Sequence, residues 1–129
     1  MIVIHFRFTD FLDVVSELKT WQDARGHCIA MGARLMEIRT QEEYDTALSL
    51  YHQIGDEFWL GGTDYPEEMR WVWDSNQEEV DLNRFWAHTP QENTNANCLA
   101  MSDSGMYHRH CFTNDINSID TRKSVCKFI

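Results

Sequence analysis

The chain has 129 residues, a length that holds one ordinary domain, so we expect residues 1–129 to fold as a single unit. Its formal net charge is −10 and its 11 Lys and Arg residues are scattered, which argues against a nucleic-acid partner. No stretch approaches the roughly 20 apolar residues that span a bilayer, so we expect no membrane insertion.

The first half of the chain predicts one strand and two helices. Residues 3–8 alternate weakly, as a strand does. A helix ending near Gly32 is indicated by apolar residues at spacings of three and four: Trp21, Ala24, Cys28 and Met31. Residues 35–38 form a short connection or strand, and the capping-box order of Thr40 and Glu43 opens a second helix. One side of this helix carries Tyr44, Ala47, Leu48 and Tyr51, and Gly55 marks its end.

The second half of the chain predicts strands around a long loop. The expected strands are residues 58–62, 70–74, 98–101, 106–111 and 124–128. Residues 74–97 are polar and rich in Asn, which is typical of a loop. A structureless loop of this length in a compact domain is either a wrong assignment or a functional segment. Two early helices and late strands predict an α+β fold.

The chain contains four cysteines: Cys28, Cys98, Cys111 and Cys126. Their spacing matches no Cys-x-x-Cys metal or redox motif, and an even number favours two disulfides in an oxidising compartment. We therefore expect a secreted, extracellular protein, although the residues alone allow three pairings. The opening of the chain lacks the apolar stretch and cleavage site of a signal peptide, which indicates a mature or trimmed chain.

Several spaced motifs together resemble the C-type lectin-like family over residues 21–127. They are Trp21-x-x-Ala24-x-x-x-Cys28-x-x-x-Gly32, Phe58-Trp59-Leu60-Gly61-Gly62, Trp71-x-Trp73, Phe85-Trp86 and Cys98-Leu99. The resemblance implies a C-type lectin-like fold with two helices, small antiparallel sheets, a long loop and two disulfides. It also implies that Cys28 pairs with Cys126 and Cys98 with Cys111, and that Trp21, Trp59, Trp71 and Trp73 lie in the core.

Calcium binding of the family's usual kind is not expected. Members that bind sugar through calcium carry a Glu-Pro-Asn or Gln-Pro-Asp triplet in the long loop, because calcium takes six to eight oxygen ligands. Here Pro90 lies between Thr89 and Gln91, Ala96 replaces an acidic residue, and residues 106–108 read Met-Tyr-His where Trp-Asn-Asp is usual. The alternatives are a rearranged calcium site through Glu92 and Asn93, helped by residues 114–115, or polar residues that only form turns.

Two other kinds of chemistry are less favoured by the sequence. His108 and His110 share one side of a predicted strand and His88 lies in the loop, so they could hold zinc, but hydrogen-bonded surface histidines explain the pattern more simply. No Ser or Cys nucleophile has an assignable neighbouring base, so we do not expect an enzyme.

The resemblance implies a carbohydrate-binding lectin whose long-loop face recognises a glycan or glycoprotein. The residues predicted to bind it are Gln91, Glu92, Asn93, Asn97, Asp103, Tyr107 and His108. The alternatives are a lectin-like module that binds a protein ligand without sugar, and an acidic matrix or mineral-associated protein. A homo-oligomer would raise the apparent affinity of a weak single site, as innate recognition of repeated glycans requires.

Overall fold

The computed structural model describes residues 5–9, 11–90, 96–109, 111 and 120–128. Its helices are α1 (Trp21–Ala30) and α2 (Gln41–Ile54). Its strands are β1 (His5–Thr9), β2 (Leu12–Lys19), β3 (Ala33–Leu35), β4 (Phe58–Thr63), β5 (Val72–Trp73), β6 (Cys98–Ser102), β7 (Gly105–Arg109) and β8 (Arg122–Phe128). The predicted α+β class is confirmed, but β2 was not predicted.

Thr20 is the N-cap of helix α1: its hydroxyl accepts a hydrogen bond from the Asp23 amide and so caps the first turn. Its predicted core face is confirmed at three positions, which the structure buries: Trp21, Ala24 and Cys28. Met31 is half-buried and forms the C-cap, and Gly32 follows with a positive φ of 79°, a conformation that glycine adopts without strain.

Helix α2 carries the predicted capping box. The Thr40 side chain accepts from the Glu43 amide at 3.1 Å, while the Glu43 carboxylate accepts from the Thr40 amide at 3.0 Å. The helix ends at Gly55, which is left-handed with φ of 77°. Ala47 and Leu50 are fully buried, so the helix packs one face on the core.

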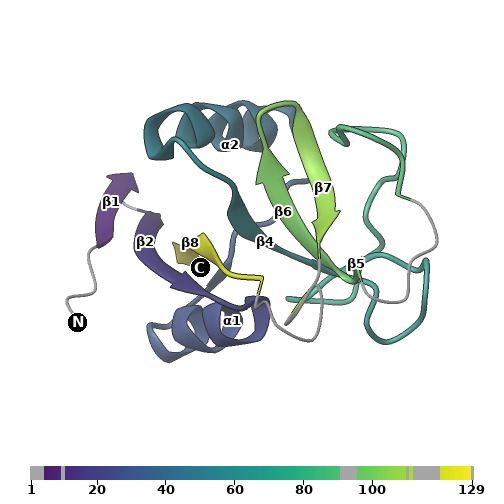
Figure 1. Ribbon diagram of the computed structural model, residues 1–129, viewed down its shortest axis with the longest axis horizontal. Helices are drawn as coiled ribbons and strands as arrows, with labels where there is room; N and C mark the ends of the chain where they lie inside the picture. Colours follow the sequence, from purple (N-terminus) through teal and green to yellow (C-terminus); the bar gives the residue numbers. More distant parts are fainter. Residues whose placement is uncertain (1–4, 10, 91–95, 110, 112–119, 129) are drawn as a thin grey trace.

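The strands form one connected sheet in the order β1-β2-β8-β4-β6-β7, with β3 on β8 and β5 on β4 (Figure 1). The prediction of small antiparallel sheets was wrong in one respect, because β4 and β8 pair in parallel. The reason is that the last strand returns to the middle of the sheet, between β2 and β4, and runs in the direction of β4. The other strand pairs are antiparallel.

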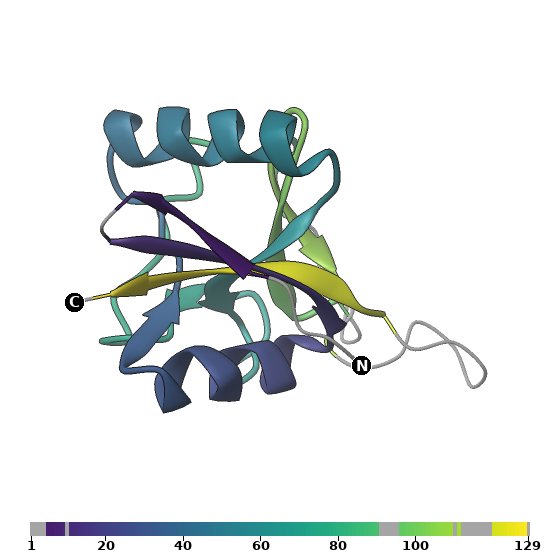
Figure 2. The same ribbon diagram turned by 90° about the vertical axis from the view of Figure 1, so that its left-hand side faces the viewer.

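The two helices lie on opposite faces of the sheet (Figure 2), and each covers its own hydrophobic cluster. Trp71 and Trp73 lie in the cluster under α2, while Trp21 and Trp59 lie in the cluster with α1. All four tryptophans are buried, which confirms that they are core residues. Within the described residues, neither helix is long and apolar enough to cross a membrane.

Two disulfides join distant parts of the chain, with the pairing that the resemblance implied. Cys28 of α1 bonds to Cys126 of β8, and Cys98 of β6 bonds to Cys111. The cysteines of the first disulfide are 98 residues apart in the sequence, and those of the second are 13 residues apart. In the chain-entropy model these links stabilise the fold by about 4–5 and about 3 kcal/mol.

The long loop lies at the end of the molecule away from β1 and β2 (Figure 1). The predicted strand over residues 70–74 is reduced to β5, because only Val72 and Trp73 pair with β4. The described part of the loop is irregular apart from isolated bridges at Glu79 and Trp86. Of the residues that the sequence predicted to bind ligand, Asn97, Tyr107 and His108 are described near this end of the molecule, at the start of β6 and in β7.

Candidate functional site

The segment around Trp86 lies along β7 and extends the sheet edge. The Met106 amide donates to the Phe85 carbonyl at 2.7 Å, and the Ala87 amide donates to the Met106 carbonyl at 2.9 Å. Gly105 makes this approach possible, because a Cβ there would lie 2.7 Å from the Phe85 carbonyl oxygen. The loop side chains near Trp86 are therefore held beside those of β7.

Three rings gather at this edge: His88, Tyr107 and His108, which we call the aromatic cluster. The Tyr107 and His108 rings stack with centroids 5.5 Å apart and planes 12° apart. His88 meets Tyr107 edge-on at 5.6 Å. Tyr107 and His108 are half-buried and His88 is exposed, so the cluster combines apolar ring surface with polar atoms near solvent.

The His108 side chain contacts the core residue Trp71 and the end of the long loop at Ala96. Its ring lies edge-on to Trp71, with centroids 6.1 Å apart, and Trp71 in turn packs edge-on against Trp86 at 5.6 Å. The His108 Nδ1 atom lies 3.4 Å from the Ala96 carbonyl oxygen. The imidazole thus lies between Trp71 and the chain that leads into β6.

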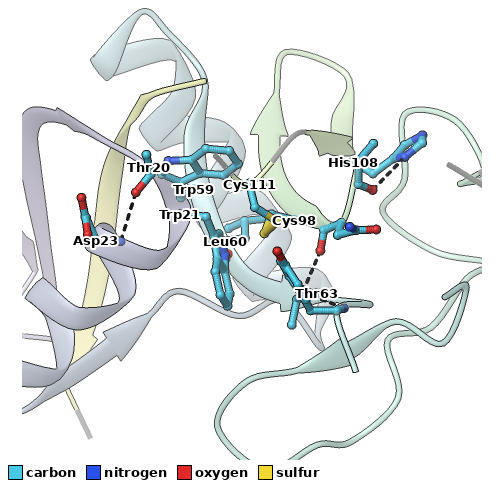
Figure 3. The surroundings of a disulfide bond; sticks show 12 residues. Thr20, Trp21, Asp23, Trp59, Leu60, Thr63, Cys98, His108 and Cys111 are labelled. Atoms are coloured by element: carbon cyan, nitrogen blue, oxygen red, sulfur yellow. Dashed lines mark hydrogen bonds between the residues drawn. A yellow bond between two sulfur atoms is a disulfide. The ribbon is translucent and has the colours of Figure 1, made fainter. Parts of the chain in front are cut away.

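The backbone of Asn97 is hydrogen-bonded to the end of β4. Its carbonyl oxygen accepts hydrogen bonds from the Thr63 hydroxyl at 2.7 Å and from the Asp64 amide at 3.2 Å. Asn97 immediately precedes Cys98, and Figure 3 shows Thr63 next to the Cys98–Cys111 disulfide. The disulfide and these hydrogen bonds fix the Asn97 backbone between the end of β4 and the start of β6, and its side-chain Oδ1 is buried.

Asp64 is a buried carboxylate that sequence reasoning did not select. Its residue is 1% exposed, and its Oδ2 accepts from the Met69 amide at 2.9 Å. Its Oδ1 is buried and has no hydrogen-bond partner among the described residues. Burial raises the pKa of Asp64 to about 6, and the neighbouring carboxylate of Glu68 adds to the rise. An Asp and a Glu four residues apart after a buried strand are the sequence signal that marks this pair.

Glu57 is a second carboxylate that sequence reasoning missed, at the opposite end of β4. Arg109 of β7 donates to it from two nitrogens, at 3.0 and 2.7 Å, and Arg122 of β8 donates at 2.9 Å. Burial alone would raise the pKa of Glu57, but the hydrogen bonds and charges of the two arginines outweigh it and lower the pKa below its ordinary value.

The described residues do not fit a calcium ion of the family's usual kind. They contain no group of three or more His, Cys, Asp or Glu side chains that could hold a metal. At the positions where the family usually has ligands, Ala96 and residues 106–108 offer one side-chain oxygen, the Tyr107 hydroxyl. Asp64 and Glu68 are neighbouring carboxylates, but they are only two. Calcium takes six to eight oxygens, so we derive no step through it.

The predicted ligand-binding residues are separated by the structure. Asn97, Tyr107 and His108 come together at one end of the β6–β7 hairpin, where Cys98 pairs with Arg109. Asp103 is exposed in the turn at the other end, beyond the pair of Ser102 and Gly105. Gln91, Glu92 and Asn93 lie outside the described residues, as do His110 and residues 114–115, so their predicted roles stay predictions.

Comparison with known proteins places this geometry in a family. The family described as Lectin C-type domain matches residues 17–128. C-type lectin domain family 4 member A of Homo sapiens is 25% identical over 118 residues, which are 90% of this chain and 48% of that protein. Lactose-binding lectin l-2 of Anguilla japonica is 27% identical over 116 residues, 87% of this chain and 68% of that protein.

Among solved structures, the herring type II antifreeze protein has a TM-score of 0.71 at 21% identity, covering 92% of this chain and 91% of that one. This likeness shows a shared fold. The chain spans about half the length of the human relative, 48%. The match over residues 17–128, together with the two disulfides and the sheet between two helices, shows that the chain belongs to the C-type lectin domain family.

Proposed function

We propose that this protein is a non-enzymatic lectin that binds glycans on its long-loop face. The observation that carries the proposal is the aromatic cluster, in which Tyr107 and His108 stack and His88 stands against them near solvent. Membership of the C-type lectin family supports it, and so does the likeness to a relative named as a lactose-binding lectin.

The cluster has the chemistry that recognises a sugar. The faces of a sugar ring carry C–H groups, which pack on aromatic rings, while its hydroxyls need donors and acceptors at the ring edges. Tyr107 supplies a hydroxyl, and the imidazoles of His88 and His108 supply nitrogens. The side-chain amide of Asn97, just before β6, is proposed to add to them. Recognition of this kind is an equilibrium and needs no covalent step.

We propose that this binding does not depend on calcium. The described side chains at the face offer rings, imidazoles and amides rather than converging carboxylates. Gln91, Glu92 and Asn93 are proposed to add hydrogen bonds from the loop. A rearranged calcium site through Glu92 and Asn93 is the competing hypothesis, because a carboxylate and an amide are both calcium ligands.

The two disulfides support a proposed location outside the cell, because such bonds persist in oxidising compartments. A face of three rings is small, so we also propose that copies of the chain bind together to multivalent glycans, which raises apparent affinity.

A glycan array, run once in calcium and once in chelator, tests the proposed function. We expect the same glycans to bind in both buffers. A signal that chelator removes would support the calcium site at Glu92 and Asn93 instead, and calorimetric titration of calcium into the protein would then show heat. No signal in either buffer would overturn the proposal and favour a protein ligand, which pull-down with protease and glycosidase controls would identify.

A further inference from the structure

Glu57 accepts hydrogen bonds from two arginines, and one of them, Arg109, packs on Tyr107 of the aromatic cluster. Its Oε1 accepts from Nε of Arg109 and from Nε of Arg122, and its Oε2 accepts from Nη2 of Arg109 at 2.7 Å. The side chains are only partly exposed, at 22% for Glu57, 25% for Arg109 and 16% for Arg122. Partial burial strengthens such charge-assisted pairs relative to pairs on an open surface.

Arg109 connects this carboxylate to the proposed binding face. Arg109 and Tyr107 are two residues apart on β7 and share one side of the strand. The guanidinium carbon of Arg109 lies 4.0 Å from the centroid of the Tyr107 ring. A planar guanidinium that is held at two nitrogens has a fixed orientation, and it therefore limits how the ring against it can turn.

Arg122 makes the arrangement depend on Glu57. It packs over the ring of Trp59, with its guanidinium carbon 4.9 Å from the centroid, and it pairs with Asp120. Both guanidiniums therefore meet at one carboxylate. Without the charge of Glu57, two cations would face each other. Among the described residues, Arg122 has a second carboxylate partner and Arg109 has none. Arg109 would then move away from Tyr107.

We infer that Glu57 is a positioning residue for glycan binding: through Arg109 it fixes the Tyr107 ring in the orientation that receives the sugar. Glu57 itself touches no ligand in this arrangement. The inference rests on the proposed function, because the sugar is the one proposed for the aromatic cluster. Glu57 thereby joins the residues that determine affinity, although it lies 52 positions from Arg109 in the sequence.

The first experiment does not need a ligand. Nuclear Overhauser contacts between the Tyr107 ring protons and the Arg109 side chain should be present in the wild type and lost in Glu57→Gln. Absence of these contacts in the wild type, or their persistence in Glu57→Gln, would overturn the inference whether or not the protein binds glycans.

The second experiment measures the Kd of a glycan found on the array. We expect Glu57→Gln to weaken binding about five- to tenfold, and to change it less than about twofold in a Tyr107→Ala background, because the effect passes through that ring. Equal losses in both backgrounds would mean that Glu57 only supports the fold, and no loss in either would also contradict the inference.

Asp74→Asn is the matched control. Asp74 likewise receives two arginines, with Arg25 at 2.8 Å and Arg34 at 3.8 Å, and its side chain is 15% exposed. These arginines belong to α1 and β3, away from the aromatic cluster. We expect its Kd to match the wild type. If no wild-type glycan binding is found, the proposed function fails, and the nuclear Overhauser measurement still decides whether Glu57 fixes the Tyr107 ring.

Discussion

The two carboxylates that flank β4 have pKa values shifted in opposite directions. Glu57 precedes the strand and meets two arginines, and its pKa lies below the ordinary value. Asp64 follows the strand and meets Glu68, and its pKa is raised to about 6. Both groups are withdrawn from water, so the difference comes from the charges that the fold brings to them.

Ionised Glu57 therefore stabilises the fold, whereas ionised Asp64 destabilises it. Each residue contacts a different residue near the proposed binding face. Glu57 accepts a hydrogen bond from Arg109, and the backbone amide of Asp64 donates one to the Asn97 carbonyl. The ionised form of Glu57 is favoured in the folded state, whereas that of Asp64 is disfavoured. The fold tolerates the second because the disulfides and the core supply stability elsewhere.

The largest effect is expected from Glu57→Gln. Removing the charge leaves two guanidiniums without their shared partner, so the free energy of unfolding at pH 7 should fall by about 3 kcal/mol. Because the folded pKa of Glu57 is lowered, its contribution is present above the ordinary pKa and is lost as pH falls through the folded value. Urea unfolding of both proteins should therefore converge in acid, and a gap that is independent of pH would contradict this explanation.

Asp64→Asn should act in the opposite direction. Between the ordinary pKa of 3.8 and the raised value of about 6, folded Asp64 holds more protons than unfolded Asp64, so wild-type stability falls as pH rises through this window. An amide keeps the acceptor for Met69 without the charge, and we expect the variant to be more stable by about 2 kcal/mol at pH 7. At pH 3.5 the two proteins should have the same stability; a variant that is less stable at pH 7 would contradict the assignment.

The smallest effect is expected from Glu68→Gln. It removes the charge that adds to the raised pKa of Asp64 but leaves the burial, which is the larger cause. The free energy of unfolding at neutral pH should rise by less than about 1 kcal/mol, because Glu68 is only partly buried. The pH dependence of stability should shift to lower pH, whereas an unchanged profile would show that burial alone determines the pKa of Asp64.

Local features of the fold were predictable from the sequence. The capping box of Thr40 and Glu43 and the spacing of Trp21, Ala24 and Cys28 depend on neighbouring residues, and both helices are confirmed. Strand β2 was missed because four successive residues, 12–15, are all buried, including Asp13, so the usual alternation of apolar and polar residues is absent.

The candidate site was predictable only in part. The choice of Tyr107 and His108 followed from their motif position, and the structure stacks their two rings on β7. Asp103 was predicted to assist binding, but the structure places it in the turn at the opposite end of the β6–β7 hairpin. Glu57 could not be selected, because its partners lie 52 and 65 residues away and sequence spacing does not encode such pairs.

Calorimetric titration of an array-identified glycan in EDTA, with Tyr107→Ala compared against Phe11→Ala, tests the proposed binding face most directly. Phe11 is an aromatic residue that is 63% exposed, and it lies between β1 and β2, at the end away from the long loop. We expect Phe11→Ala to bind as the wild type does and Tyr107→Ala to bind at least about tenfold more weakly. Equal affinity of both variants, or no wild-type binding in EDTA, would contradict a calcium-independent glycan site at the aromatic cluster.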